Sequence, residues 1–386
     1  MSFFSPEQEA LRESGRAFVR REVLPHLQEW EDAGEVPREL HRAAAEQGFL
    51  GLGVPEEKGG SGGTFLDALA LTEAMAEAGA SSGLLAALFT SGIALPHIVA
   101  AGTDDLVDRF VRPTLAGETI GSLAVTEPGG GSDVANIRTT ALRHPATGDY
   151  VVNGAKTFIT SGVRADFVTT AVRTGGPGYG GVSLLVIEKG TPGFEVTRSL
   201  SKMGWHCSDT AELGFTDVRV PVANLVGEEN KGFYYIAEQF VTERLALAVH
   251  GYGIAARALE LTVEHARTRA TFGKPLITNQ VVRSELVEMR RLVEVARCYT
   301  HEVARRHAAG ESVIAEVCLA KKTACDAASY VTDKAVQFFG GSGYMHGTEV
   351  ERAYRDARIL GIGGGATEVL NDLTARLLGY APRARA

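Results

Sequence analysis

A glycine-rich loop is the first stretch of this sequence that could perform chemistry. Residues 123–133 read LAVTEPGGGSD, so a short apolar strand runs into a proline and three consecutive glycines. Glycine has no Cβ and permits positive φ, so successive backbone N–H groups can turn toward one bound group. Thr126 and Ser132 add hydroxyl donors. Taken alone, such a loop is more often an ordinary tight turn than a binding site.

Metal and nucleotide motifs are not found elsewhere in the sequence. The ten histidines are scattered, with no HExxH and no Cys/His cluster at ligand spacing, so we expect no metal site. We interpret His301 and His307 as solvated helix residues. Residues 251–256 read GYGIAA and mimic a dinucleotide fingerprint, but the pattern on both sides is helical. Small residues here predict close helix packing instead.

Five separated motifs carry a family resemblance: LAVTEPGGGSD at 123–133, FITSG at 158–162, RATFGK at 269–274, QFFGG at 337–341 and YRDAR at 354–358. In this order and spacing they resemble the acyl-CoA dehydrogenase family, over nearly the whole chain. Further similarity is to the long-chain and isovaleryl types, through segments 227–235 and 242–245 and the glycines before Thr367 and Glu368.

The resemblance implies FAD as the cofactor. Loop 123–132 and segment 158–160 match positions that line the isoalloxazine, with Thr126 and Thr160 as the main hydroxyls. In a helix break, Arg269 would pair with the pyrophosphate and Phe272 would stack on adenine. Taken singly, each threonine has a plain explanation as a strand residue, and Arg269 has one as a surface arginine. The residues implied for FAD are Leu123, Ala124, Val125, Thr126, Gly131, Ser132, Phe158, Ile159, Thr160, Arg269, Phe272, Gln280, Gln337, Phe338, Phe339, Gly340, Gly341, Ala366, Thr367 and Glu368.

The resemblance also implies contacts with an acyl-CoA thioester. For the cofactor, Gln280 and segment 337–341 would contact the nucleotide half of FAD, partly from a neighbouring subunit. The paired glycines of that segment could instead simply cap a helix. Tyr234 could instead be a core aromatic of its helix. The residues implied for the substrate are Ser132, Tyr234, Val241, Thr242, Arg244, Gly364 and Gly365.

The catalytic base departs from the commonest family pattern. Most members carry a glutamate directly before Gly-Thr, and the matching residue here is Gly364. The long-chain and isovaleryl types place it before an arginine on the first C-terminal helix, and this chain has Glu243 followed by Arg244 there. Apolar neighbours would raise the pKa of Glu243 toward neutrality, and Gly364 would leave space for its carboxylate. Glu368 is a rival carboxylate, and a solvated helix residue is the plainer interpretation of Glu243.

These implications predict α,β-dehydrogenation of an acyl-CoA to the trans-2-enoyl-CoA, as in fatty-acid β-oxidation. Glu243 would remove the α-proton, the β-hydride would pass to flavin N5, and an electron-transferring flavoprotein would take the electrons. We expect a homotetramer or dimer. The alternatives are an acyl-CoA or nitroalkane oxidase that uses O₂, and a non-catalytic flavin- or acyl-binding scaffold.

Composition is that of an ordinary globular protein. The 386 residues are 45% hydrophobic and 22% charged, and the net charge of −8 argues against a nucleic-acid surface. Cysteines 207, 298, 318 and 325 form no CxxC pair, and the last three lie in helical sequence, where we expect them in the core. The N-terminus is charged at once and no apolar run reaches membrane-spanning length, so we expect a cytoplasmic protein without a membrane span.

The elements that would position these residues fall into three parts, and together they predict an α+β fold of the acyl-CoA dehydrogenase type. Residues 1–118 read as an N-terminal helical domain, with Ser5 and Gln8 as a capping box and helices near 38–48, 64–79, 83–99 and 103–111. Residues 119–229 read as an antiparallel β-domain, a sheet or barrel, with a hairpin turn at Asn153–Gly154. Residues 230–386 predict a four-helix bundle with helices near 231–268, 276–308, 312–340 and 348–378.

Overall fold

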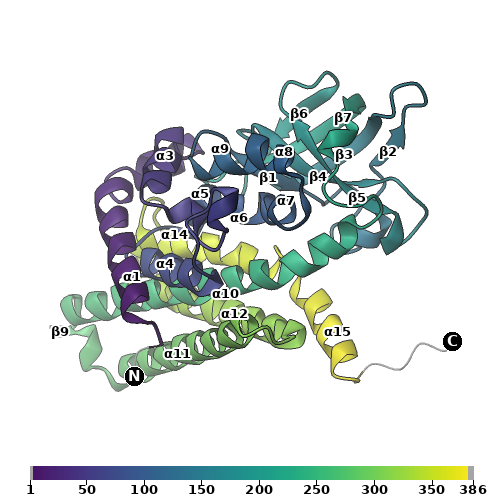
Figure 1. Cartoon of the computed structure of the whole chain (residues 1–386). Coiled ribbons are helices and arrows are strands. Elements are labelled where there is room, and N and C mark those ends of the chain that lie inside the picture. The colour runs from purple at the N-terminus through teal and green to yellow at the C-terminus, as the bar shows by residue number, and fades with distance from the viewer. Residues whose placement is uncertain (1–2, 381–386) are drawn as a thin grey trace.

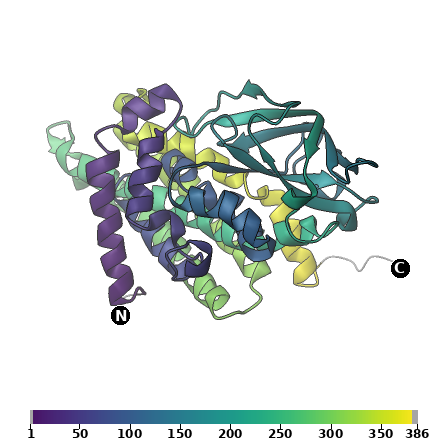
Figure 2. The same ribbon diagram turned by 45° about the horizontal axis from the view of Figure 1, so that its top comes forward.

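The computed structural model describes residues 3–380, which form helices, then a β-sheet, then helices. Figure 1 shows the sheet at one end of the molecule, with both sets of helices packed beside and below it. The first and last thirds of the chain are in contact, because α4 and α11 both pack against the long α10. Turning the molecule keeps the sheet on the same side of the helices (Figure 2).

The N-terminal helices begin as the sequence predicts. Ser5 caps the first helix, and its hydroxyl and the Gln8 side chain close the predicted capping box. The helical residues are α1 Pro6–Phe18, a π-turn Val19–Val23, α2 Leu27–Ala33, α3 Arg38–Glu46, α4 Phe65–Glu77, α5 Ser82–Leu88, α6 Ser91–Ala94, α7 Pro96–Ala101, α8 Asp104–Leu106, a π-turn Val107–Val111 and α9 Arg112–Leu115. Two short 3₁₀ turns, Phe49–Gly51 and Glu56–Lys58, lie between α3 and α4.

The predicted single helix over 83–99 is wrong, because the segment divides into α5, α6 and α7. Thr90 turns its hydroxyl back onto the carbonyls of Ala86 and Ala87, and Pro96 starts a new helix at its first position. The short middle piece, α6, is thereby free to lie against strand β1 (Gly121–Ala124). Its position matters for the site described below.

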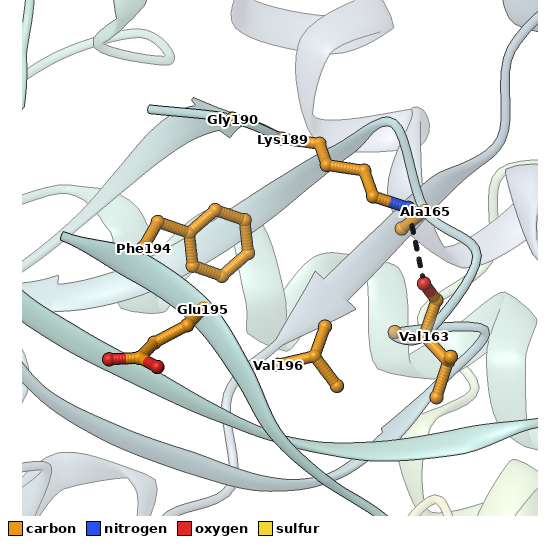
Figure 3. A pocket seen from close by; sticks show the side chains of 8 residues that line it. Val163, Ala165, Lys189, Gly190, Phe194, Glu195 and Val196 are labelled. Atoms are coloured by element: carbon orange, nitrogen blue, oxygen red, sulfur yellow. Dashed lines mark hydrogen bonds between the residues drawn. The ribbon is translucent and has the colours of Figure 1, made fainter. Parts of the chain in front are cut away.

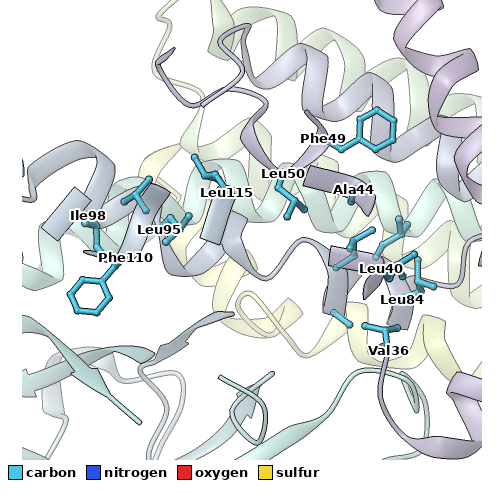
Figure 4. Packing of buried hydrophobic residues seen from close by; sticks show 14 of the residues in the cluster. Val36, Leu40, Ala44, Phe49, Leu50, Leu84, Leu95, Ile98, Phe110 and Leu115 are labelled. Atoms are coloured by element: carbon cyan, nitrogen blue, oxygen red, sulfur yellow. The ribbon is translucent and has the colours of Figure 1, made fainter. Parts of the chain in front are cut away.

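One hydrophobic cluster joins the N-terminal helices to the sheet. It includes Leu40, Phe49 and Leu84 among the helices, and Phe110 packs its ring 4.9 Å from that of Phe167 on β4 (Phe167–Arg173). Figure 4 shows these helical side chains converging above the strands. Because the cluster is continuous across both parts, the sheet and the helices share a core rather than touching at a polar interface.

The middle sheet is mixed rather than wholly antiparallel. Its strand order is β1-β4-β2-β3-β7-β6, with β5 pairing on β4, and β1 runs parallel to β4. The other long pairings, β2–β3, β3–β7, β4–β5 and β6–β7, are antiparallel as predicted. The strands not yet given are β2 Thr140–Arg143, β3 Tyr150–Thr160, β5 Val182–Glu188, β6 Phe194–Ser199 and β7 Thr210–Val220.

The predicted hairpin turn at Asn153–Gly154 is wrong, because both residues lie inside β3. Gly154 has φ +150°, and a Cβ there would lie 2.6 Å from the Thr139 hydroxyl oxygen. The glycine therefore serves a β-bulge and a close backbone approach, which use the same residue type as a turn. The hairpin turn occurs earlier, between β2 and β3, where His144 and Asp149 are hydrogen-bonded.

Three long helices follow, close to their predicted limits: α10 Gly232–Thr268, α11 Gln280–Ala308 and α12 Ile314–Phe339. The predicted close packing at GYGIAA is confirmed, since a Cβ on Gly251 would lie 2.9 Å from the Ala324 carbonyl oxygen of α12. Between α10 and α11 lie β8 Ala270–Thr271, β9 Lys274–Pro275 and a 3₁₀ turn Leu276–Thr278.

The predicted fourth helix over 348–378 is interrupted. It consists of α14 Glu349–Ala357, a 3₁₀ turn Arg358–Gly361 and α15 Thr367–Leu377, with the short α13 Gly341–Tyr344 preceding it. Gly364 and Gly365 have φ of +61° and +99°, in the left-handed region that an α-helix cannot use. The break forms the wall of the candidate site.

Two other predictions about single residues are wrong. Cys298 is exposed, whereas Cys318 and Cys325 are buried as predicted. His301 is buried, because its Nε2 lies 2.6 Å from a carboxylate oxygen of the buried Glu73 on α4. Within residues 3–380, no helix is long and apolar enough to cross a membrane, and no three His, Cys, Asp or Glu side chains gather as a metal site would require.

Candidate active site

The glycine-rich loop and the end of β3 lie side by side. The hydroxyl of Ser122 donates to the carbonyl of Thr160 at 2.6 Å, and the amide of Thr157 donates to the carbonyl of Thr126 at 2.9 Å. A register shift between β3 and β7 turns Phe158 outward, with φ +60° and 69% of its surface exposed. The two segments that the sequence assigns to one flavin are therefore brought together.

A buried ion pair holds this loop. Lys156 donates to a Glu127 carboxylate oxygen at 2.9 Å and to the carbonyl of Val125 at 2.9 Å. The same carboxylate accepts from the amides of Arg138 and Thr139. Burial lowers the pKa of Lys156 to about 8 although the Glu127 charge opposes this, so the ammonium remains the main form at neutral pH.

The predicted base faces the predicted glycine. A Cβ placed on Gly364 would lie 3.3 Å from Oε1 of Glu243 and 2.4 Å from Cδ1 of Leu247, so a side chain there would have to displace one or both of them. The two residues are thus adjacent, as the prediction that Gly364 leaves space for this carboxylate requires. Burial raises the pKa of Glu243, while the charges of Arg244 and Lys321 act in the opposite direction. The rival Glu368, in the first turn of α15, is exposed.

Two cations hold the turn around Gly364. Arg244 directs Nε to the carbonyl oxygen of Gly364 at 3.3 Å, and Lys321 donates to the carbonyls of Gly363 and Gly365, the latter at 2.7 Å. The Arg244 guanidinium also lies over the Phe240 ring, 5.1 Å from its centroid. Three consecutive carbonyls are thus taken up by side chains of α10 and α12.

The short helix α6 connects the base to the glycine-rich loop. On α10, one turn before Glu243, Gln239 donates to the carbonyl of Gly92 at 2.8 Å. At the start of the same segment, the hydroxyls of Thr90 and Ser161 lie 2.7 Å apart, and Ser161 follows Thr160 directly. The helix that carries the predicted base and the predicted flavin segment therefore both hydrogen-bond to the same stretch of backbone around α6.

The residues assigned to the nucleotide half of FAD lie at the far end of α10. This helix has 37 residues, which corresponds to about 55 Å. Its first residue packs on β5, whereas Arg269 follows its last residue and is exposed. Phe272 is fully exposed. Figure 1 shows β9 and the sheet at opposite ends of the molecule.

These distant residues still form one group. His265 stacks its ring on Phe339 at 4.1 Å between centroids, which brings the end of α12 to the end of α10. Gln280 and Gln337 are exposed beside them, as are Gly340 and Gly341. One chain does not bring this group together with the glycine-rich loop.

The remaining predicted substrate residues lie near the base or the loop. Tyr234 is 54% exposed, so it is not the core aromatic that its helix position also allowed. Val241 packs on a buried cluster, and the Thr242 hydroxyl donates to the Gln239 carbonyl. Ser132 is exposed on the loop, and Ala366 and Thr367 begin α15 beside the Gly363–Gly365 turn.

A cavity of about 360 Å³ lies elsewhere on the sheet. Val163, Ala165, Phe194 and Val196 supply apolar walls, and Lys189 donates to the Val163 carbonyl across one side (Figure 3). Lys189 and Glu195 also line it, and none of its lining residues is among those predicted for the flavin or the substrate.

Sequence reasoning missed two residues of the site, Lys156 and Lys321. Lys156 stands alone in a largely apolar strand, whereas Lys321 is the first of two consecutive lysines on a largely apolar helix, and a lysine is normally solvated. The signal available was position: Lys156 lies two residues before Phe158, and Lys321 follows an apolar run on α12. Neither position reveals a partner far away in the chain.

Comparisons with known proteins decide the family. Models of the acyl-CoA dehydrogenase N-terminal, middle and C-terminal domains match residues 5–118, 122–218 and 230–379. The chain belongs to the acyl-CoA dehydrogenase family. It is 38% identical to the rat (Rattus norvegicus) mitochondrial long-chain specific acyl-CoA dehydrogenase, over 97% of this chain and 86% of that protein.

Solved structures agree with this assignment. A probable acyl-CoA dehydrogenase from Mycobacterium abscessus is 62% identical with a TM-score of 0.96, over 98% of this chain and all of that one. An acyl-CoA dehydrogenase from Geobacillus kaustophilus is 38% identical with a TM-score of 0.93, over 97% of this chain and 98% of that one. The predicted fold class is confirmed.

Proteins of this family are FAD flavoproteins, and the residues present fit that cofactor. Within the described chain, the hydroxyls of Thr126, Ser132 and Thr160 have no hydrogen-bond partner. Together with the exposed Phe158 ring, they offer donors and an apolar surface of the kind a flavin ring requires.

Proposed function

We propose that this acyl-CoA dehydrogenase oxidises an acyl-CoA to the trans-2-enoyl-CoA with Glu243 as the catalytic base. The observation that carries this assignment is the position of Glu243, whose carboxylate lies against the glycine turn that replaces the more usual base. Its raised pKa suits a group that must accept a proton near neutral pH.

In the proposed reaction, Glu243 takes the α-proton as the Cα–Cβ bond becomes double. When bound, FAD accepts the β-hydrogen as hydride. Thr126, Ser132 and Thr160 would orient the flavin's polar edge, and the bulge at Phe158 would support its ring. Arg244 would hold the turn in place so that the carboxylate keeps one position.

We propose that each FAD is completed by a second copy of the chain, in a homotetramer or dimer. Arg269, Phe272, Gln280 and segment 337–341 form one group, separated from the glycine-rich loop by the length of α10. Their exposed side chains would serve the nucleotide half of a neighbour's cofactor. An electron-transferring flavoprotein is the proposed acceptor. Four cysteines free of disulfides support a cytoplasmic location.

Anaerobic mixing with a series of acyl-CoAs tests the function. We expect bleaching of the bound flavin by at least one thioester, and Glu243→Gln to retain FAD and acyl-CoA binding but lose on the order of a thousandfold in the reduction rate. Glu368→Gln is the comparison variant: because Glu368 is also implied for FAD, its rate is expressed per bound flavin, and on that basis we expect it to stay near the wild-type value. Loss of reduction in Glu368→Gln but not in Glu243→Gln would reassign the base.

The same preparation separates the alternatives. An oxidase would produce peroxide under air at the rate of substrate turnover, and a scaffold would bind acyl-CoA without bleaching. We expect flavin bleaching without peroxide formation at the turnover rate. The scaffold alternative is disfavoured because the carboxylate that a scaffold would lack is present and lies against Gly364.

A further inference from the structure

Lys321 is a buried lysine whose charge has no salt-bridge partner in the described residues. It lies on α12 with 1% of its surface exposed. Buried lysines are rare because removing the ammonium from water is costly, and they are usually paired. Lys156 shows the usual solution, since its ammonium contacts the Glu127 carboxylate. Lys321 instead donates to two backbone carbonyls, those of Gly363 and Gly365.

Those two carbonyls flank Gly364, the residue that Glu243 faces. The turn has two consecutive left-handed glycines and so depends on outside contacts to keep one shape. A neutral donor could satisfy carbonyls at a lower desolvation cost than an ammonium. Burial lowers the pKa of Lys321 and the charge of Glu243 acts in the opposite direction, so the two residues are coupled electrostatically as well as through the turn.

We propose that Lys321 is a positioning residue of the dehydrogenation: its ammonium holds the Gly363–Gly365 turn against Glu243 and supplies the positive charge facing that carboxylate from α12. The inference rests on the proposed role of Glu243 as base. The other charge facing Glu243 is Arg244, from its own helix, whereas Glu368 of α15 is exposed. Cys318 and Cys325 are the remaining titratable neighbours of Lys321.

Lys321→Met removes the charge and both hydrogen bonds while keeping a buried side chain of similar length. The positive charge of Lys321 favours the ionised form of Glu243. Its loss should therefore shift the acidic limb of the pH profile of flavin reduction to higher pH, by on the order of one unit. Loss of the hydrogen bonds should also lower the plateau rate about tenfold. Lys321→Gln retains a hydrogen-bond donor without the charge. Its pH profile should therefore shift as far as that of Lys321→Met, while its plateau rate should lie between those of Lys321→Met and the wild type.

The neighbouring Lys322 provides the matched control. It points outward and pairs with Asp326 one turn later on α12, so Lys322→Met should keep the wild-type limb and plateau. Rates are expressed per bound flavin, so partial loss of FAD does not imitate the effect. Infrared titration of the Glu243 carboxyl band, identified by its absence in Glu243→Gln, gives a second readout that is independent of turnover.

The outcomes separate this inference from the proposed function. If Glu243→Gln still reduces the flavin, the base assignment is wrong. If Glu243→Gln is inactive but both Lys321 variants keep the wild-type limb and carboxyl titration, Lys321 only fastens the loop and the inference is overturned. If Lys321→Met does not fold, the Lys321→Gln limb alone decides between these results.

Discussion

At the scale of single residues, Gly364 sets the shape of the site. A Cβ on this residue would lie 2.4 Å from Leu247 and 3.3 Å from Glu243, and its φ of +61° is unfavourable for any side chain. Gly363, beside it, has no positive φ, and its Cβ would be 3.7 Å from the nearest atom. Two adjacent glycines of one turn therefore differ sharply in whether a side chain could be added to them.

Gly364→Ala should destabilise the protein by about 2–4 kcal/mol, since left-handed strain and overpacking both contribute. It should also slow flavin reduction by about tenfold or more, because the methyl group displaces the Glu243 carboxylate. Denaturant unfolding and anaerobic reduction measure the two effects. Gly363→Ala is the control, and an equal effect of both substitutions would show that the turn has no special position.

The residues of the site were predictable where the chain keeps them in a recognisable motif. We predicted that Glu243 faces Gly364 because one motif has a glycine where most family members have the glutamate, while another has a glutamate before Arg244. The roles of Lys321 and Lys156 did not follow, since each depends on carbonyls or a carboxylate supplied by a distant segment. The burial of His301 was hidden for the same reason, because Glu73 lies 228 residues earlier.

At the scale of elements, the glycine-rich loop is held by the pair of Glu127 and Lys156. Its glycines give the loop little stiffness of their own, so the buried charges fix its path by tying the segment after β1 to Lys156 of β3. Breaking one member leaves the other charge buried without a partner, which typically costs 3–5 kcal/mol. When both charges are removed together, no unpaired charge remains buried.

We expect Lys156→Met and Glu127→Gln each to weaken FAD retention and to lower the free energy of unfolding by about 3–5 kcal/mol. The double variant should lose clearly less than the sum of the single variants. FAD content and denaturant unfolding of all three variants provide the measurement. Strict additivity would mean that the pair does not act as a unit in holding the loop.

Helices and strands differed in how well the sequence predicted them. The predicted limits of the long helices α10, α11 and α12 lie close to the observed ones, because the helical spacing of apolar residues continues along each of them. The hairpin at Asn153–Gly154 failed because a bulge uses the same residue types as a turn. The last helix was predicted through its glycine turn because the carbonyl contacts from Arg244 and Lys321, which stabilise the break, lie outside the local sequence.

At the scale of the whole molecule, α10 determines what one chain can complete alone. The order of helices, sheet and helices was predictable from the change of period along the chain, and the family match confirms it. The separation of the two groups of FAD residues was not, because it depends on α10 being one unbroken helix. A single protomer therefore carries the two groups of residues predicted for FAD at opposite ends of α10.

The shared core also buries several histidines away from any charge partner. Burial lowers the pKa of His97 to about 4 and that of His250 to about 4, and it is the main cause lowering His41 to about 3. His97, on α7, is 2% exposed, and neither ring nitrogen has a hydrogen-bond partner among the described residues. Its neutral form is thus the only one that the folded protein accommodates readily.

This burial predicts that the protein loses stability between about pH 6.5 and pH 4. A histidine whose folded pKa lies below its unfolded value of 6.5 contributes stability above that value and loses it as the pH falls toward the folded pKa. For His97 the loss between pH 7 and pH 5 is about 2 kcal/mol. We expect His97→Leu to abolish this pH-dependent loss. The difference in unfolding free energy between the variant and the wild type should therefore change by about 2 kcal/mol between pH 7 and pH 5. Denaturant unfolding at a fixed FAD concentration measures it, and an unchanged difference would mean that His97 is already hydrated or paired in solution.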